Sequence, residues 1–216
     1  MILSRGRSFL FIHIPKTGGT SLALALEARA MKDDIMLGDT PKARNRRRRV
    51  RDAQTRGRLW KHAGRADIEG LLPEAELDRL FAFTLVRNPW DRVVSYYHWL
   101  RKQSFDHPAV TLAKDLSFRD FTVHNQTIAA LRSTPSASYL KRADGSLHCN
   151  AFIRLEHFQA DAAPLFDHLG FRLDLQRVNA SDRQADWRIY YDDASAEAVA
   201  LACAEDIGRF EYSFNV

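Results

Sequence analysis

The chain has 216 residues, of which 45% are hydrophobic and 27% charged, as in ordinary globular proteins. This composition excludes a fully disordered chain, collagen and a coiled coil, and the length suits one domain or two small ones. No apolar run approaches the about 18 residues of a membrane span, so we expect no transmembrane segment. The start of the chain lacks the apolar stretch of a signal peptide. Cys149 and Cys203 are far apart, which favours reduced thiols in a cytoplasmic protein.

The net charge of +5 is concentrated in one segment. Nine basic residues and one acidic residue lie between Lys42 and Arg58, so the rest of the chain is slightly acidic. We expect residues 38–58 to form a polar, Arg-rich excursion that is a loop or partly helical. Three interpretations stay open: a solvated loop, a surface for an anionic polysaccharide bound through Arg44–Arg58, or nucleic-acid binding. Nucleic acid is the least favoured, because no nucleic-acid-binding motif and no interleaved aromatic residues accompany the arginines.

Apolar runs and helix-forming segments alternate along the chain. The predicted elements, in chain order, are strand 9–14, helix 21–31, strand 80–86, helix 90–102, helix 117–131, strand 151–155, helix 158–169 and helix 194–207. Three strand–helix alternations predict a single α/β domain over residues 1–216, with a mostly parallel central sheet flanked by helices. Ligands of such sheets bind beyond the carboxyl ends of the strands.

The segment between the first strand and its helix has the residues of an anion-binding loop. It contains Lys16, Thr17, Gly18, Gly19, Thr20 and Ser21. Glycines allow close approach of the backbone, the first N–H groups of a helix favour negative charge, and Lys16 adds a full positive charge. Lys16 precedes the two glycines, so the segment is not a Walker A loop. The alternative is an ordinary strand-to-helix turn.

A second candidate anion site follows the strand at 80–86. Arg87 precedes a helix that Asn88 is expected to cap, with Pro89 at its first position. An arginine at the end of this strand attracts an anion and repels a metal ion, so we expect two phosphate sites and no required metal. Ser95 would add a hydroxyl donor to the second site. The alternative interpretation is that Arg87 only pairs with Asp91.

Together, the two motifs resemble those of sulfotransferases. Residues 15–21 are similar to the loop that binds the 5′-phosphosulfate, and residues 87–97 are similar to the 3′-phosphate motif. The resemblance is strongest to carbohydrate sulfotransferases, which include heparan sulfate and uronyl 2-O-sulfotransferases and their bacterial relatives. Weaker similarities are found at Lys61-His62, at 152–156, at 178–181 and in the C-terminal segment 190–212.

This resemblance implies a P-loop-like three-layer fold, with 3′-phosphoadenosine 5′-phosphosulfate as donor and a hydroxyl, expected on a carbohydrate, as acceptor. It implies that Lys16 is catalytic and binds the donor together with Thr17, Gly18, Gly19, Thr20, Ser21, Arg87 and Ser95. His62 matches the position of the catalytic histidine and is the expected base. His98 is the other contender. Arg183 lies in a segment that closes over the nucleotide in relatives, which suggests a donor contact.

Two other functions fit parts of the sequence. A non-catalytic module could use the same fold to bind a polysaccharide or nucleic acid, and a small-molecule kinase could use the first loop for ATP with Mg²⁺. The retention of Lys16, His62, Arg87 and Ser95 argues against the module, and an arginine where the kinase needs an acid argues against the kinase. The sequence predicts neither the acceptor nor the oligomeric state.

Overall fold

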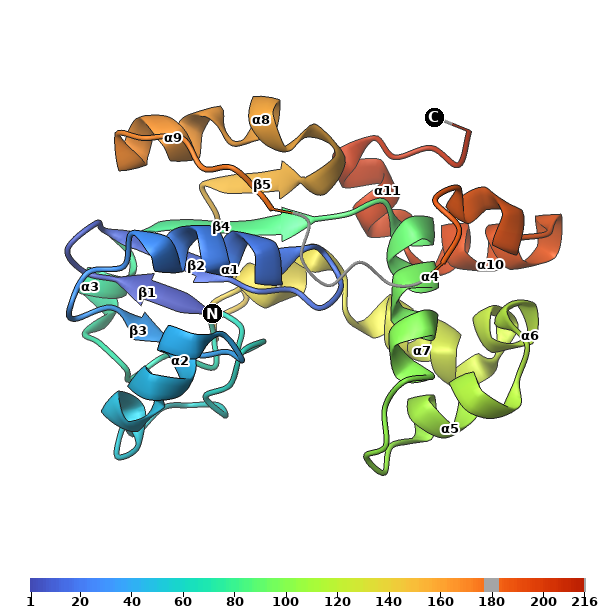
Figure 1. The fold of residues 1–216 in the computed structure, drawn as a ribbon, viewed down its shortest axis with the longest axis horizontal. Coiled ribbons are helices and arrows are strands. Elements are labelled where there is room, and N and C mark those ends of the chain that lie inside the picture. The colour runs from blue at the N-terminus through green and yellow to red at the C-terminus, as the bar shows by residue number, and fades with distance from the viewer. Residues whose placement is uncertain (177–182, 216) are drawn as a thin grey trace. The chain divides into compact units, whose positions relative to one another are not determined.

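The structure is a computed structural model that describes residues 1–176 and 183–215 (Figure 1). Contacts between residues group the chain into two compact units. The first comprises residues 1–86 and the segment that begins at Ser136, and the second comprises residues 87–135 and the C-terminal segment. The expected single domain over 1–216 stays a prediction, and each unit is described by itself below.

The first unit is built on a five-stranded mixed sheet. Its strand order is β3 (Ile35–Met36), β1 (Ile2–Ser4), β2 (Phe9–Ile12), β4 (Phe81–Val86) and β5 (Ala151–Arg154). The pairs β2–β4 and β4–β5 are parallel, with Phe11 opposite Phe83 and Phe83 opposite Ala151. The three strands predicted from the sequence are therefore confirmed as neighbours in one sheet.

The prediction of a mostly parallel sheet is wrong in one half of the sheet. Strand β1 pairs antiparallel with both β2 and β3. Only Arg5–Ser8 separates β1 from β2, and a parallel pair needs a crossover of a dozen residues or more. A tight turn, with Ser8 at a φ of 52°, therefore fixes a hairpin. The described sheet joins a parallel half, β2–β4–β5, to an antiparallel edge.

Alternating side chains give each face of this sheet its own core. Phe9, Phe11 and Phe83 contact α1 (Gly19–Ala28), α8 (Phe158–Asp161) and α9 (Ala163–Leu169). The opposite face, with Leu10 and Ile12, packs on α3 (Glu74–Leu77), η2 (Ser136–Leu140) and residues 59–72. The remaining helices of this unit are α2 (Pro41–Arg46), η1 (Arg47–Val50) and η3 (Leu155–His157). Helices thus flank the sheet, and α1 crosses β2 in Figure 1.

The described part of the second unit is helical. Its elements are α4 (Pro89–Leu100), α5 (Pro108–Asp115), α6 (Phe118–Val123), α7 (Asn125–Ser133), η4 (Trp187–Tyr190), α10 (Asp193–Ala202) and α11 (Ala204–Phe210). Trp90, Trp187 and Tyr191 form an aromatic core. The helix expected over 117–131 is divided in two, because His124 is extended (φ −65°, ψ 133°) and caps α7 through its side chain. Cys203 similarly separates α10 from α11.

Candidate functional site

The loop after β2 has the backbone conformation of an anion cradle. Lys16 has a φ of 67° and Gly18 a φ of 83°, both in the left-handed region. Gly18 is the N-cap of α1 and makes no side-chain capping bond. Left-handed residues turn successive N–H groups towards one point, as in phosphate-binding loops. The hydrogen bonds of α1 begin with the N–H groups of Ser21 and Leu22, which donate to the carbonyl of Gly18, so the N–H groups of Gly19 and Thr20 precede the first bonds of the helix. The loop therefore suits an anion.

The two glycines of the loop are required by its surroundings. A Cβ atom on Gly18 would lie 2.8 Å from Cδ1 of Leu155, and one on Gly19 would overlap the ring of His13. The loop backbone therefore packs directly on these two side chains. Gly18 is needed for its conformation as well, since other residues rarely adopt this φ.

The hydroxyl groups of the loop differ in their surroundings. Thr17 is buried, and its Oγ1 donates a hydrogen bond to the carbonyl of Ile14 at 2.9 Å. This bond closes the loop, so Thr17 has a structural role beside the predicted donor-binding one. Thr20 and Ser21 are half-buried in the first turn of α1.

His62 lies beside this loop through its contact with His13. Its Nδ1 is 2.6 Å from the backbone oxygen of His13, and the two rings are 4.7 Å apart. A carbonyl oxygen only accepts, so Nδ1 carries the proton and Nε2 holds the lone pair of a base. Burial is the main cause that lowers the pKa of His62 to about 4; the bond to His13 opposes this and the charge of Lys61 adds to it. His62 is neutral at pH 7.

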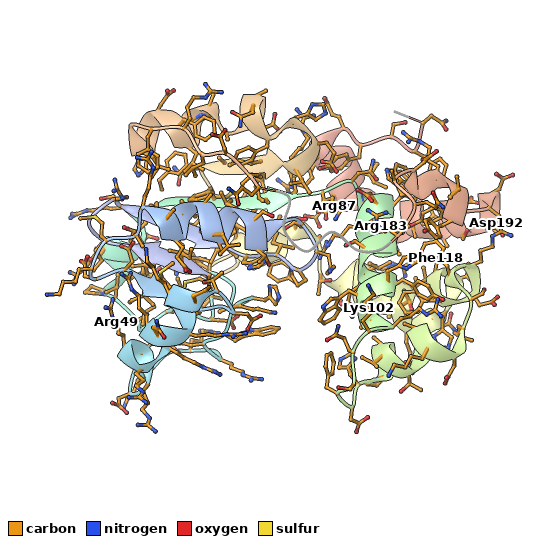
Figure 2. The ribbon with its side chains drawn as sticks, in the orientation of Figure 1. Arg49, Arg87, Lys102, Phe118, Arg183 and Asp192 are labelled. Atoms are coloured by element: carbon orange, nitrogen blue, oxygen red, sulfur yellow. The ribbon has the colours of Figure 1, made fainter. Side chains whose placement is uncertain are left out.

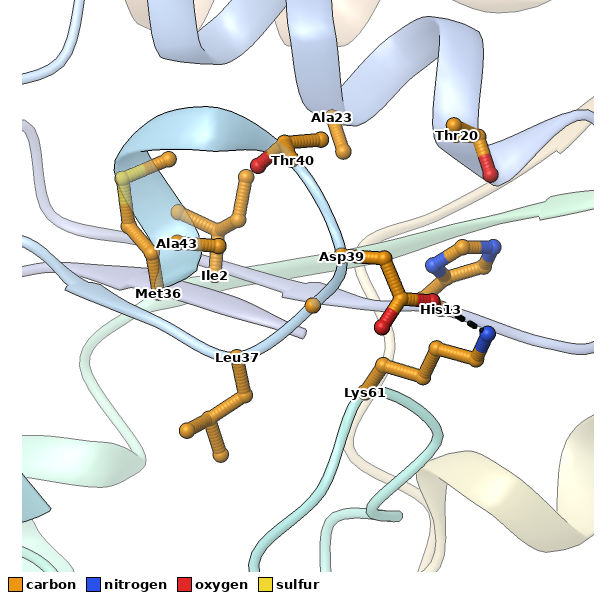
Figure 3. A pocket seen from close by; sticks show the side chains of 11 residues that line it. Ile2, His13, Thr20, Ala23, Met36, Leu37, Asp39, Thr40, Ala43 and Lys61 are labelled. Carbon is orange, nitrogen blue, oxygen red and sulfur yellow. Dashed lines mark hydrogen bonds and ion pairs between the residues drawn. The ribbon is translucent and has the colours of Figure 1, made fainter. Parts of the chain in front are cut away.

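A small pocket adjoins the loop in the first unit (Figure 3). His13 and Thr20 line it together with Asp39 and Lys61, and the figure shows the His13 ring close to the Lys61 side chain. Lys61 Nζ is 2.6 Å from Asp39 Oδ2, and this bond is the main cause of the lowered pKa of Asp39. No sequence pattern selects Asp39, because its partner Lys61 is 22 residues away.

The second predicted anion site has two arginines arranged around one carboxylate. Figure 2 shows these arginines, Arg87 and Arg183, near each other. Arg87 Nη2 is 2.6 Å from Asp91 Oδ2, and Arg183 binds the other oxygen of Asp91. All three side chains are at least 84% buried. The structure thus contains the Arg87–Asp91 pair that was the alternative interpretation. A guanidinium has five N–H donors, so this pair still leaves each arginine with donors directed elsewhere.

Helix α4 is the support of this cluster. The side chain of Asn88 accepts hydrogen bonds from the backbone N–H groups of Trp90 and Asp91, which confirms the predicted N-cap. Ser95 is buried one turn after Asp91, at the i+4 spacing that places both residues on one helix face. Arg87, Ser95 and Arg183 therefore belong to the second unit, whereas Lys16 and His62 belong to the first.

His98 lies on α4, and its side chain packs among aromatic rings. Its ring lies 5.1 Å from that of Tyr190 and 5.6 Å from that of Tyr97. The competition between His62 and His98 as base is therefore one between residues of different units. The tautomer of His62 is set by its short bond to the carbonyl of His13.

The Arg-rich segment is more regular than expected. Pro41 begins α2 after Thr40, and η1 continues to Val50. Arg46 donates to the carbonyl of Met31 at 2.7 Å, and Arg49 to that of Asp34 at 3.1 Å. These two arginines support the turn that precedes β3. Other members are exposed: Lys42, Arg44, Arg47, Arg48, Arg51, Arg56 and Arg58.

Comparison with family models decides the class of the protein. The model described as the sulfotransferase family matches residues 1–214. The chain belongs to the sulfotransferase family. The match includes both units of this sulfotransferase, and it confirms the resemblance drawn from residues 15–21 and 87–97. The weaker similarity at 178–181 lies outside the described residues.

No curated protein and no solved structure matches the chain. Within residues 1–176 and 183–215, no helix is both long and apolar enough to cross a membrane. The same residues contain no group of three or more His, Cys, Asp or Glu side chains placed to hold a metal ion.

Proposed function

We propose that this sulfotransferase moves a sulfuryl group from 3′-phosphoadenosine 5′-phosphosulfate to a hydroxyl of a carbohydrate. The observation that carries the proposal is the conformation of the loop after β2. Lys16 and Gly18 are both left-handed there, and Gly18 is the N-cap of helix α1. Such a loop suits a phosphosulfate and needs no metal ion. A parallel β2–β4–β5 core with this loop also supports the P-loop-like assignment, and a family model over both units supports one domain.

The proposal assigns each anionic end of the donor to one set of residues. Lys16, Thr17, Gly18, Gly19, Thr20 and Ser21 hold the 5′-phosphosulfate. Arg87, Ser95 and Arg183 hold the 3′-phosphate, where an anion would compete with Asp91 for the guanidinium groups. Arginine suits this role because its planar group binds two oxygens of a phosphate at once.

In the proposed reaction, the acceptor hydroxyl attacks sulfur while the bond between sulfur and the bridging phosphate oxygen breaks. The hydroxyl proton passes to Nε2 of His62, and adenosine 3′,5′-bisphosphate leaves. A pKa of about 4 makes His62 neutral but a weak base in the free protein. The negative charge of a bound donor would raise this pKa towards neutrality, where general bases are most effective.

Lys16 has the complementary role of stabilising the leaving group. Negative charge grows on the bridging oxygen as the bond to sulfur breaks. A fixed ammonium and fixed N–H groups directed at that oxygen lower the barrier, because they need no reorganisation during the reaction. Thr17 contributes by holding the loop closed through Ile14.

The acceptor and the compartment are proposed from the exposed charge and from the cysteines. Exposed arginines in the segment 42–58 would suit an anionic polysaccharide, whose carboxylates or sulfates they could bind. The cytoplasm is the proposed compartment because of the cysteine spacing. Burial raises the pKa of Cys203 to about 11, which keeps that thiol protonated and unreactive.

Thermal stabilisation by nucleotides tests the proposal directly. Adenosine 3′,5′-bisphosphate without metal should raise the melting temperature of the chain, and this shift should be smaller at the same nucleotide concentration in the variant Arg87→Gln. ATP with Mg²⁺ should give a smaller shift. A larger shift with ATP and Mg²⁺ would indicate a kinase, and no shift with either nucleotide would indicate a non-catalytic module.

A further inference from the structure

The backbone around His13, the residue that directly follows β2, is fixed on both sides. The carbonyl oxygen of Ile12 accepts a hydrogen bond from Thr84 Oγ1 at 2.7 Å, and that of Ile14 accepts one from Thr17 Oγ1 at 2.9 Å. Both threonines are buried, so water does not compete for these bonds. The carbonyl of His13 between them is therefore a rigid acceptor.

The side chain of His13 contacts both parts of the candidate site. Its ring lies against the backbone of Gly19, because a Cβ atom on that glycine would overlap three of the ring atoms. The same ring is 4.7 Å from the ring of His62, at 70° to it. The fully buried ring of Phe11, 5.7 Å away and inclined by only 20°, supports it from the core. His13 thus touches both the first residue of α1 and the candidate base.

His13 is less suited than His62 to accept a proton. It is buried, whereas His62 is half-buried. Burial is the main cause that lowers the pKa of His13 well below its usual value, and the positive charges of protonated His62 and of Lys61 add to it. His13 is therefore neutral at pH 7. A neutral neighbour allows His62 to take up a proton, because two adjacent imidazolium rings would repel each other.

We propose that His13 is a positioning residue that holds the base His62 at a fixed distance from the donor loop. Its carbonyl determines which nitrogen of His62 carries the proton, and its ring is the spacer between Gly19 and the His62 ring. This inference rests on the proposed function and deepens it. A base and a donor loop act together only when they are held within about 0.5 Å of the productive geometry.

Gly19 offers a way to move this spacer from the side of the loop. Gly19 does not have a left-handed φ, and the three atoms nearest to an added Cβ all belong to the ring of His13. Gly19→Ala should therefore displace that ring and, through it, His62. In a His13→Ala background the obstacle is absent, so the added methyl group should be accommodated.

The test follows the ring signals of His62 by NMR in the unchanged protein, Gly19→Ala, His13→Ala and the double variant. In the unchanged protein the ring should carry its proton on Nδ1 and titrate with a pKa of about 4. Gly19→Ala should shift its signals. His13→Ala should raise its pKa towards the ordinary value of about 6.5, because His62 becomes more exposed.

The double variant decides whether His13 is the link. Gly19→Ala added to His13→Ala should leave the His62 signals where His13→Ala alone places them. The inference is overturned if the two substitutions act additively on these signals, or if Gly19→Ala does not move them. Gly19→Ala alone decides the inference if His13→Ala does not fold.

Two matched controls separate the spacer from general effects of the substitutions. His168→Ala removes another histidine whose ring stacks on a phenylalanine of the sheet, 4.7 Å from the ring of Phe81. Gly38→Ala adds a methyl group that meets only Ala43, at an ordinary contact distance of 3.7 Å. Neither control should move the His62 signals.

Release of radiolabelled sulfate from the donor to water measures the transfer without a chosen acceptor. His13→Ala should lower this rate about 10- to 100-fold, as for a misplaced catalytic group, and should keep the Kd of adenosine 3′,5′-bisphosphate within about threefold. His168→Ala should change neither quantity. An unchanged rate in His13→Ala would overturn the inference and leave the proposed function in place.

Failure of the proposed function has a different signature. The unchanged protein would then neither bind adenosine 3′,5′-bisphosphate nor release sulfate. The NMR series needs no nucleotide, so in that case it decides by itself whether His13 links the loop to His62.

Discussion

The two candidate anion sites differ in whether backbone groups or side chains form them. In the first unit, backbone conformation dominates: Lys16 and Gly18 are left-handed, and the glycines pack on His13 and Leu155. In the second unit, side chains dominate: Arg87 and Arg183 share the carboxylate of Asp91. A backbone site is formed before its ligand arrives. A site of arginines needs a counter-ion to hold it, and its ligand must displace or share that counter-ion.

This comparison suggests different roles for the two sites. The preformed loop, with His62 nearby, suits the reacting group, because transition-state stabilisation depends on fixed geometry. The arginine cluster suits affinity for a distant, unreactive phosphate. Substitutions in the first site should therefore mainly lower kcat, and substitutions in the second should mainly raise the Kd of the donor.

The largest effect is expected from His62. His62→Ala should lower kcat by about 10²–10⁴-fold, the range for loss of a general base, and should leave the Kd of adenosine 3′,5′-bisphosphate unchanged. Steady-state kinetics and nucleotide titration measure the two quantities. His98→Ala provides the comparison and should cost less than about tenfold. A larger loss with His98→Ala than with His62→Ala would exchange their roles.

The next effect concerns the charge of Lys16. Lys16→Ala should lower kcat by about 10²–10³-fold, as for one lost donor to the developing charge. Lys16→Gly removes the same charge but relieves a left-handed backbone at φ 67°. Both variants should have equally low kcat. The free energy of unfolding of Lys16→Gly should be about 1 kcal/mol higher than that of Lys16→Ala, measured by chemical unfolding. A glycine variant with near-normal kcat would show that the charge is dispensable.

The sequence predicts the middle of this fold better than its edges. The apolar runs 9–14 and 80–86 and the N-cap at Asn88 depend on local patterns, and they are confirmed. Strand β1 has only three residues and gains its place from pairing with β2. The helix α2 is held by Glu27, whose carboxylate accepts from the backbone N–H of Lys42, 15 residues away. Local propensity cannot indicate such contacts.

The same limit applies to the candidate site. Lys16, the glycines and Arg87 stand out because their motifs are contiguous in the chain. The bond between His62 and His13 joins residues 49 positions apart, and the bond between Lys61 and Asp39 joins residues 22 apart. The sequence could select His62 only through the family resemblance, and it could not predict its tautomer or its lowered pKa.

A moderate effect is expected in the arginine cluster. Arg87→Gln should raise the Kd of adenosine 3′,5′-bisphosphate about 10- to 100-fold, because a hydrogen bond to a charged group contributes roughly 1.5–3 kcal/mol. The change in kcat at saturating donor should stay within about threefold. Arg209→Gln is a matched control, since Arg209 pairs on the exposed surface with Glu205. If Arg87→Gln instead lowered kcat at saturating donor, the division between the two sites would be wrong.

The smallest effect is expected in the pH dependence of kcat/KM. Burial lowers the pKa of His62 to about 4, so its reactive neutral form is complete at pH 5 and above and is lost only as the pH falls through 4. The ratio of kcat/KM between the unchanged protein and His62→Ala removes the titration of donor and acceptor. This ratio should change less than about twofold from pH 5 to 7.5. A histidine with the ordinary pKa of about 6.5 would lose roughly 30-fold by pH 5. Such a loss would show that His62 is solvated in the free protein, and that its contact with His13 does not bury it.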